Sequence, residues 1–420
     1  MRGEHFIPFR RTDIVSMCAD QLPDAEREPF HSFATMLASL LHHRFHARIE
    51  ALKDAYHPFN PEADTRAVAP LEAKERLAAQ QRLEEELAAL ARAANFTPID
   101  SADLERAFNE HSLLKVRLAA DRGAVTKTIL FRRGESTRTR TIPTWWGLRR
   151  KTVTFTNYAR VLVYATFRDA EGLRESEIER LPYRPGSTII KLFQNVPRDD
   201  LEMVLPNVKI RMRRIDKLLI GIPALVSGIV VIVTKLLASG WLLLLLLAFW
   251  LGLREEPVVL NKTGLISVAI GLIAFGAYVV RQVTNFKNRK ILFMKALSEN
   301  LYFRNLDNDA GVFHHLLDAA EEAEVTEVLL AYHFLRTADG PQAGRDVAEL
   351  DRRIEEFFAQ RWDTQVDFEV EDGLRKLRDL ALVSEDAEGG LRALPLDEAQ
   401  EHLHRVWDDL FVSAQPTPQR

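Results

Sequence analysis

Three acidic residues, Asp199, Asp200 and Glu202, lie close together near the middle of the chain, directly after Arg198. Neighbouring carboxylates can exchange protons with a substrate or bind a metal ion, so these three are the candidate catalytic group. They also follow Pro197, where a helix could begin, and acidic side chains at a helix start cap free N–H groups and oppose the helix dipole. The pattern favours capping over catalysis.

Three histidines, His42, His43 and His46, lie within one predicted helix. His42 and His46 are four residues apart, so they share a helix face and could bind one metal ion. No HExxH pattern accompanies them, because the acidic residue four positions beyond His46 is Glu50. We therefore expect these histidines to be exposed or to contact a partner, and we predict no metal site.

A third polar cluster is the sequence NLDNDAG at residues 305–311, which is similar to an oxygen-rich calcium loop. Such a loop needs a glutamate at its twelfth position, and the twelfth residue counted from Asp307 is Asp318. Asn, Asp and Gly clusters are typical of turns and helix caps. No phosphate loop, GxSxG elbow or zinc signature occurs in the sequence, so we predict no cofactor and leave enzymatic activity open.

A long apolar segment separates the elements that would position these residues. Residues Leu218 to Leu253 contain one charged residue, Lys235, and residues Leu265 to Val280 contain none. Since about 20 apolar helical residues cross a bilayer core, the segment (218–281) predicts a transmembrane hairpin with spans at about 229–251 and 263–281. The Lys235 side chain would then extend toward the interface.

Basic residues flank both ends of the apolar segment. Positive charge stays on the cytoplasmic side of a membrane, so both flanks should face the cytoplasm. The expected location is the cell inner (cytoplasmic) membrane, with several crossings and both termini cytoplasmic. The flanking basic residues are Lys209, Arg211, Arg213, Arg214 and Lys217 before the segment, and Arg281, Lys287, Arg289 and Lys290 after it.

The net charge of −4 is unevenly distributed along the chain. Residues 313–420 hold 25 acidic and 11 basic residues, a net of −14, so residues 1–312 carry a net of +10. Because an acidic surface repels phosphates, we expect no nucleic acid partner and predict a protein partner for the acidic C-terminal end. The single cysteine, Cys18, excludes an intramolecular disulfide and a cysteine-based zinc site.

The N-terminal flank, residues 1–217, is predicted to be an α+β domain. Apolar residues at helical spacing in Asp24–Ala55 and Pro70–Ala94 predict helices. Short runs rich in β-branched and aromatic residues then predict an antiparallel sheet. These runs are Leu113–Leu118, Thr126–Phe131, Thr152–Phe155, Val161–Phe167 and Ser187–Phe193.

A basic stretch surrounds Trp145 and Trp146 in this flank, formed by Ser136–Arg140 and Arg149–Lys151. One interpretation is a loop that closes a sheet. The other is a surface that contacts anionic lipid headgroups, since basic and aromatic residues together are typical of membrane interfaces. The sequence leaves both interpretations open.

The C-terminal flank, residues 282–420, is predicted to be mainly helical. Val347–Gln360 and Val370–Leu380 read as helices, and Ala381–Leu394 reads as two short strands around a turn. Helix, helix and β-hairpin are the order of a winged helix, here over about residues 325–395. The second helix lacks the excess of basic residues that a DNA reader needs, so we expect a protein-contacting or structural version.

Several long and specific segments stand out along the chain. They are HFIPFRRTDI (5–14), YHPFNPEADT (56–65), LFQNVPRDDLEMVLPNVKI (192–210), TKLLAS (234–239), FWLGLREEPV (249–258), FKNRKILFMKALSENLYFRNLDNDAGVF (286–313) and LLAYHFL (329–335). In these segments the chain resembles the transmembrane protein 143 family, which is built on domain of unknown function 3754. That family has bacterial, plant and mitochondrial members and no established activity, cofactor or catalytic residues. The N-terminus has no presequence pattern, so a bacterial origin is expected.

The predicted fold is thus an integral membrane protein with a two-helix transmembrane hairpin, an α+β N-terminal domain and a winged-helix-like C-terminal domain. The absence of a catalytic signature favours a membrane-anchored scaffold or regulatory protein that binds the lipid bilayer and a protein. One alternative is an enzyme acting on a lipid or membrane-borne substrate through the acidic group at 199–202. Another is a pore or transporter formed by a homo-oligomer.

Overall fold

The computed structural model divides the chain into two compact units. The first unit comprises Met1–Glu110, Asp121–Asn207 and Asn305–Arg420, and the second comprises His111–Ala120 and Val208–Arg304. Both flanks of the apolar segment therefore contribute to one unit. The structure describes residues 6–66, 69, 71–100, 117–120, 125–144, 149–171, 174–179, 181, 183–206, 208–211, 247–253, scattered helical residues from 262 to 295, and 302–338, 346–385 and 390–412.

An antiparallel sheet of five strands belongs to the first unit, with the strand order β1-β3-β4-β5-β7. The middle of β4, from Val161 to Ala165, is fully buried, as expected for a short run of consecutive apolar residues. The predicted antiparallel sheet is therefore confirmed. Its strands are β1 (Thr97–Pro98), β3 (Val125–Thr144), β4 (Arg149–Phe167), β5 (Thr188–Pro197) and β7 (Asn305–Asn308).

Two strands are much longer than the runs that predicted them. Thr152–Phe155 and Val161–Phe167 belong to one strand, β4, which pairs with β3 from Arg149 to Phe167. Hydrogen bonds between β3 and β4 extend both strands into segments whose residues are polar or basic. The interpretation of Ser136–Arg140 as a loop is wrong, because these residues lie within β3.

Two long antiparallel helices, α2 (Asp24–Tyr56) and α8 (Ala310–Arg336), connect the sheet to the C-terminal helices. Tyr56 at the end of α2 meets Phe313 at the start of α8, with ring centroids 5.5 Å apart. Phe30, near the start of α2, meets His333, near the end of α8, at 5.8 Å. The half of this pair near Tyr56 packs against α3 (Ala73–Ala93), η1 (His57–Phe59) and the sheet. The prediction of helices at 24–55 and 70–94 is confirmed.

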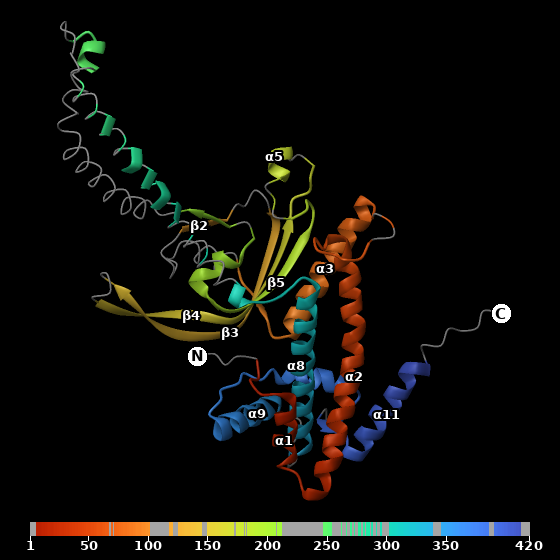
Figure 1. The fold of residues 1–420 in the computed structure, drawn as a ribbon. Helices are drawn as coiled ribbons and strands as arrows, with labels where there is room; N and C mark the ends of the chain where they lie inside the picture. Colours follow the sequence, from red (N-terminus) through yellow and green to blue (C-terminus); the bar gives the residue numbers. More distant parts are fainter. Residues whose placement is uncertain are drawn as a thin grey trace. The chain divides into compact units, whose positions relative to one another are not determined.

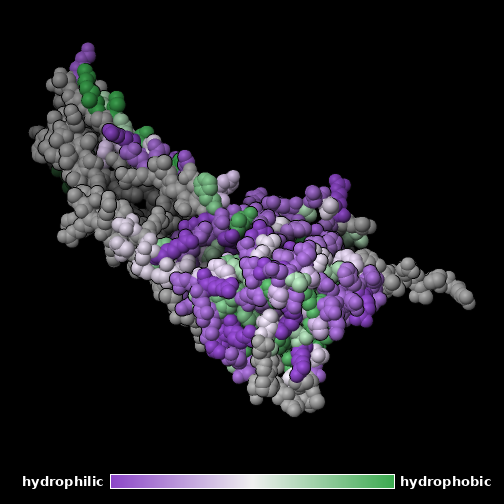
Figure 2. Space-filling model, turned by 90° about the horizontal axis from the view of Figure 1, so that it is seen from below, coloured by the Kyte–Doolittle hydropathy of each residue, from purple (hydrophilic) through white to green (hydrophobic). Residues whose placement is uncertain are grey.

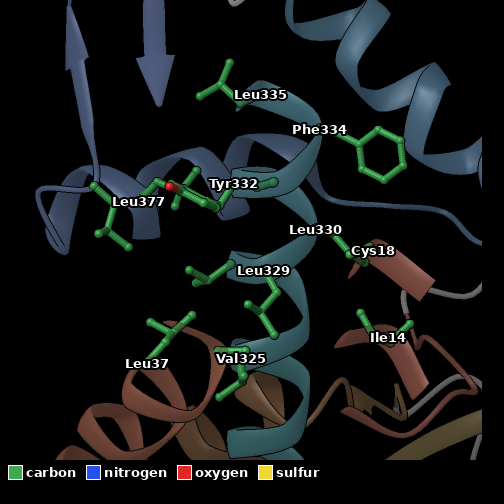
Figure 3. Close-up of a cluster of buried hydrophobic side chains, with 14 of the residues drawn as sticks. Ile14, Cys18, Leu37, Val325, Leu329, Leu330, Tyr332, Phe334, Leu335 and Leu377 are labelled. Atoms are coloured by element: carbon green, nitrogen blue, oxygen red, sulfur yellow. The ribbon is translucent and has the colours of Figure 1, made fainter. Parts of the chain in front are cut away.

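The other half of the helix pair forms a second core with α1 and the C-terminal elements. Figure 3 shows Leu329 and Leu330 of α8 among side chains from several elements, including Leu37, Cys18 and Leu377. The Tyr332 hydroxyl donates a hydrogen bond to the Leu394 carbonyl at 2.8 Å, which ties α8 to the end of the C-terminal hairpin. The elements are α1 (Arg11–Ala19), α9 (Val347–Trp362), α10 (Val370–Asp379), β8 (Val383–Glu385), β9 (Leu391–Ala393) and α11 (Leu396–Val412).

The C-terminal order of helix, helix and β-hairpin is observed where the sequence predicts it, as α9, α10 and the β8–β9 pair. A salt bridge joins α10 to α8, because Lys376 Nζ lies 2.5 Å from Glu327 Oε2. Burial raises the pKa of the Glu327 carboxyl, and the Lys376 ammonium opposes that rise. The acidic C-terminal segment therefore packs on α8 and shares a core with the N-terminal helices α1 and α2.

The second unit contains an antiparallel pair of short strands, β2 (Arg117–Ala120) and β6 (Val208–Arg211). Figure 2 shows that the first unit presents a mainly hydrophilic face, whereas large apolar side chains are exposed on the second unit. Exposed apolar patches of this kind mark interaction surfaces. The exposed side chains include Leu247, Phe249, Trp250, Leu251, Leu253, Ile266, Ile270, Ile273 and Val280.

The structure contradicts the transmembrane hairpin predicted from the apolar segment. Across the residues that the structure describes, none of the helices combines the length and the apolar character needed to cross a bilayer. Residues 212–246, which include Lys235 and most of the first predicted span, lie outside the described residues. The prediction counted apolar residues along the sequence, whereas a crossing needs one continuous helix of about 20 residues.

The described helical residues 247–250 end in a Schellman motif at Gly252, whose φ of +71° is in the left-handed region. Leu253 N donates to Ala248 O at 2.8 Å, and Gly252 N donates to Phe249 O at 3.1 Å. The fold class is corrected to a mixed helix and strand fold with a five-stranded antiparallel sheet. The same finding counts against a multi-pass membrane protein, its inner-membrane location, and the three membrane functions derived from them.

Candidate functional site

A groove of about 1010 Å³ runs along one face of α2 in the first unit. Figure 1 shows α1 and α11 on opposite sides of α2, and both contribute residues to the groove. We call this site the α2 groove. Its α2 residues are His31, Ala34, Thr35, Ala38, Ser39, His42, His43 and His46, and the others are Arg11, Thr12, Val15, Ser16, Glu321 and Trp407.

The floor of the α2 groove consists of small apolar side chains. Ala34, Ala38 and Val15 are 4%, 9% and 8% exposed, so they belong to the packed core and also line the groove. The rim on α2 consists of exposed polar side chains from His31 to His46. These positions recur every three or four residues, which places them in one stripe along the helix. The histidines that the sequence singles out are part of this stripe.

His42 is held by an acidic residue from a distant part of the chain. Its Nδ1 lies 2.8 Å from Oε2 of Glu321 on α8. An ionised carboxylate can only accept a hydrogen bond, so Nδ1 carries the proton and donates it. In the neutral ring Nε2 is then the acceptor. This arrangement fixes one tautomer of an exposed imidazole at the groove surface.

The opposite oxygen of Glu321 is paired with α1. Arg11 Nη1 lies 3.4 Å from Glu321 Oε1, and the Arg11 backbone N–H donates to Glu322 Oε1 at 3.0 Å. The Glu321 side chain is 14% exposed, so it is held between two partners and largely withdrawn from solvent. The two full charges that line the groove therefore neutralise each other.

The groove hydroxyl groups donate to their own helices. Ser16 Oγ donates to Thr12 O at 3.0 Å, and Thr35 Oγ1 and Ser39 Oγ donate to carbonyls one turn earlier, both at 2.9 Å. Their oxygen lone pairs still accept hydrogen bonds from a ligand. On the α11 side, the His43 ring meets the half-buried Trp407 ring edge to face at 6.2 Å. The groove thus offers neutral acceptors, imidazole nitrogens and an aromatic wall.

A metal role for the groove histidines has no support from the geometry. Among the described residues, no three His, Cys, Asp or Glu side chains converge as a set that could hold a metal ion. His42 and His46 share a face of α2, but the nearest acid, Glu321, already bonds His42 directly. The arrangement is suited to hydrogen bonding with a ligand and to proton transfer at His42 Nε2.

The candidate catalytic acids lie away from the groove, in the 3₁₀ helix η2 (Arg198–Val204). Asp199 and Asp200 are in its first turn, as capping residues would be, and Asp200 is 3% exposed. The Glu202 side chain lies outside the described residues. A catalytic role for these acids stays a prediction.

The NLDNDAG sequence forms β7 and the start of α8, where it closes a buried junction. Tyr56 OH donates to Asp309 Oδ1 at 2.5 Å and lies 2.9 Å from Thr188 O. The backbone N–H of Ile190 donates to Asp309 Oδ1 at 3.3 Å. Burial raises the pKa of the Tyr56 hydroxyl, and the adjacent Asp309 adds to the rise. We call this group the Tyr56–Asp309 junction, and it explains the acidic loop without a metal ion.

Gly311 lies in close contact with the Asp307 side chain beside this junction. A Cβ atom on Gly311 would lie 2.2 Å from Asp307 Oδ1, so any other residue would displace the Asp307 side chain. Asp307 Oδ1 accepts from the backbone N–H of Asn308 at 2.8 Å. The polar residues of this loop therefore stabilise the turn and the start of the helix.

The basic residues that flank the apolar segment fall into two groups. Lys209 and Arg211 are in β6, and Arg281 and Lys287 are in described helical residues of the second unit. The others, Arg213, Arg214, Lys217, Arg289 and Lys290, lie outside the described residues, as does Lys235.

Of the residues that line the groove, the sequence patterns singled out only His42, His43 and His46, and they missed among others Arg11, Glu321 and Trp407. Glu321 is 279 residues away from His42 in sequence, and no local pattern connects them. The acidic pair at 321–322 within an amphipathic helix was the available signal, but it also fits an ordinary solvated helix face.

Residues 158–311 match the family described as "Protein of unknown function (DUF3754)". The matched region extends from within β4 to the start of α8. It includes η2 and most of the Tyr56–Asp309 junction, but none of the residues that line the α2 groove. No solved structure matches the chain.

Proposed function

We propose that this chain is a protein-binding module whose α2 groove takes an amphipathic helix of a partner polypeptide. The observation that carries the proposal is a groove with a small apolar floor and a neutral polar rim along one face of a long helix. Helices bind in such grooves through apolar residues at helical spacing. The experiment below tests whether a partner occupies this groove.

The length of the groove supports a helical occupant. His31 and His46 are fifteen residues apart on α2, which corresponds to about 22 Å along the helix axis. That distance accommodates about four turns of a partner helix. Small side chains at Ala34 and Ala38 would let the two helix backbones approach closely, as small residues do at other helix interfaces.

The charges in the α2 groove support a partner helix that has a row of apolar side chains flanked by polar ones. Arg11 and Glu321 neutralise each other, so the groove has no net charge to attract a small ion. The rim hydroxyls and imidazoles instead favour hydrogen bonds with uncharged donors and acceptors. Glu321 and Trp407 come from the acidic C-terminal segment, so the proposed contact also uses that segment.

Site-specific photocrosslinking tests the proposal. A benzophenone amino acid replaces Thr35 in the groove of the full chain, and a matched variant replaces Arg44, an exposed residue of α2 that does not line the groove. Irradiation in cells should give a discrete adduct from position 35 and none from position 44. A synthetic peptide of the captured segment should become helical and bind the purified chain.

Three results would overturn the proposal. Equal adducts from positions 35 and 44 would indicate non-specific contact, and a captured segment that does not bind as a peptide would indicate mere proximity. An adduct between two copies of this chain would replace the separate partner with a homo-oligomer.

A second candidate function is general acid–base catalysis, which the orientation of His42 by Glu321 favours. An imidazole held through Nδ1 presents Nε2 as a base. Diethyl pyrocarbonate should then modify His42 faster than His31, and Glu321→Gln should slow that modification. Equal rates at the two histidines would count against this function.

The family relation also extends, in our proposal, to the transmembrane protein 143 family. The segments HFIPFRRTDI and YHPFNPEADT lie outside the matched region and support it. They supply Arg11 of the groove and Tyr56 of the junction. Members of that family should carry both residues within these segments, and members without them would contradict the relation.

A further inference from the structure

A two-stranded ribbon extends β3 and β4 beyond the rest of the sheet. β5 pairs with β4 no further than Asn157, and β1 contacts β3 only at Phe131 and Arg132. Figure 1 shows β3 and β4 continuing past β5 as a bent pair of strands. We call residues 136–144 and 149–156 the distal ribbon. Its strands of nine and eight residues span about 27 Å.

The bend that sets the distal ribbon off from the sheet has a backbone cause. Gly134 and Asn195 have φ values of +72° and +52°, in the left-handed region. Between them on β4 is Ala159, whose Cβ lies 2.6 Å from the position that a Cβ on Gly134 would take. Gly134 therefore permits both the conformation and the close approach at the bend.

One face of the distal ribbon is a ladder of threonines. The register pairs Thr137 with Thr156, Thr139 with Thr154, and Thr141 with Thr152. Five of these six side chains are exposed, and Thr156 is partly buried. The alternating positions pair Arg138 with Phe155 on the opposite face. Arg138 is exposed, and its Nη2 lies 3.2 Å from Asn195 Oδ1 near the bend.

The charge of the distal ribbon has one sign. No Asp or Glu occurs from Ser136 to Arg168, whereas the two strands of the ribbon carry five basic residues. These are Arg138, Arg140, Arg149, Arg150 and Lys151. A two-stranded ribbon has little stability by itself in water, so an exposed one gains from a surface on which to lie.

We propose that the distal ribbon binds the headgroup surface of an anionic phospholipid bilayer. Arginine and lysine side chains donate to phosphate oxygens, which matches the basic residues of the ribbon. Phe155, which the register pairs with Arg138, accompanies the basic residues. Basic residues with aromatic ones are typical of headgroup interfaces, whereas duplex phosphates offer no apolar layer. The contact is peripheral and involves no membrane-crossing helix.

Vesicle flotation with the full chain tests the proposal. Vesicles of neutral phosphatidylcholine are compared with vesicles that contain about 30% phosphatidylserine, since the anionic leaflet attracts basic segments. Each basic residue near such a surface changes the partition about fivefold, so Arg138→Gln with Arg140→Gln should weaken binding about 25-fold. The matched control, Arg82→Gln with Arg92→Gln, removes two exposed charges from α3 and should bind like the unmodified chain.

The outcomes separate the proposal from its rivals. Preference for anionic vesicles that falls with salt and is lost in the ribbon variant supports it. Equal binding to neutral and anionic vesicles, or equal binding of the ribbon and α3 variants, overturns it. Displacement of the chain from vesicles by a short DNA duplex that binds the ribbon more tightly also overturns it, in favour of nucleic acid. Circular dichroism of both variants checks that the fold is retained.

Discussion

The two faces of α2 differ in what they contact. One face is buried against α8 and holds Phe30, Phe33 and Leu37, all at 0% exposure, and it ends at the buried Tyr56–Asp309 junction. The other face carries the exposed histidines and hydroxyls of the α2 groove. The same helix thus has one face buried in the core of the chain and one face whose polar side chains remain exposed.

This difference indicates that a functional site is to be sought on the exposed face of α2. Packed interiors are sensitive to small changes in volume, so the residues of the buried face are explained by their contribution to stability. On the groove face, the His42 side chain is 63% exposed although Glu321 orients its ring. Substitutions that change stability without changing binding, or binding without changing stability, therefore test the difference between the two faces of α2.

The largest expected effect is on the buried face. Phe33→Ala would remove a ring that lies 4.5 Å from the Tyr332 ring and would leave a cavity in the core. Unfolding of the full chain in urea should show a loss of about 4 kcal/mol. His31→Ala, two residues earlier on the groove face, is the matched control. A loss below about 1 kcal/mol for Phe33→Ala would contradict the packing of α2 on α8.

The Tyr56–Asp309 junction should give the next largest effect. Asp309→Ala would remove the acceptor of the Ile190 N–H and the charged acceptor of Tyr56 OH, which would keep only the Thr188 carbonyl. We expect a loss of about 3 kcal/mol in the free energy of unfolding. Asp309→Asn keeps an acceptor oxygen at the left-handed position and should lose less. The reverse order of the two variants would show that the junction is not held by these bonds.

A buried histidine gives a pH test of the same core. Burial lowers the pKa of His333 to about 4, and Arg336 and Arg353 add to this. As the pH falls from about 6.5 toward 4, the unfolded chain gains a proton that the folded chain excludes, so stability is lost. The loss from this group should be about 2 kcal/mol at about pH 5.

The comparison of the unmodified chain with His333→Leu isolates this loss. Asp351, whose pKa is raised to about 6 by burial and by Glu355 and Asp367, changes stability in the opposite direction in the same pH range. Because Asp351 is present in both proteins, the difference between their urea unfolding curves at about pH 7 and about pH 5 reports His333. Identical pH slopes for the two proteins would show that His333 has the same pKa in the folded and unfolded chain, which would contradict its burial.

The smallest effect on stability should come from the groove face. His42→Gln removes an exposed ring and its bond to Glu321, and surface pairs of this kind contribute about 0.5 kcal/mol or less. The thermal unfolding midpoint should therefore change little, while binding of the crosslinked partner peptide should weaken. A large loss of stability in His42→Gln would make the His42–Glu321 pair structural and would remove the contrast between the two faces.

The elements that sequence patterns predicted correctly are those set by local periodicity. Apolar residues every three or four positions located α2, α3, α9 and α10, because each helix buries one stripe. The part of the distal ribbon in β3 was missed as a strand, since STRTRT alternates two polar residue types and shows no buried face. Its strand structure comes from pairing with β4, which no single segment reveals.

Contacts between distant segments limited the prediction of the site. The histidine stripe on α2 was visible in the sequence, but Glu321, Arg11 and Trp407 reach it only through packing of α8, α1 and α11. The apolar segment shows the opposite error. Its apolar composition alone predicted a transmembrane hairpin, which the described helices contradict.

The most direct test of the central claim is a calorimetric titration of the captured partner peptide into three forms of the full chain. Ser39→Trp fills the α2 groove from its exposed rim, and Arg44→Trp adds the same ring to α2 outside the groove. We predict that Ser39→Trp weakens binding about tenfold or more, while Arg44→Trp and the unmodified chain bind alike. Equal affinity of all three would contradict the assignment of the α2 groove as the binding site.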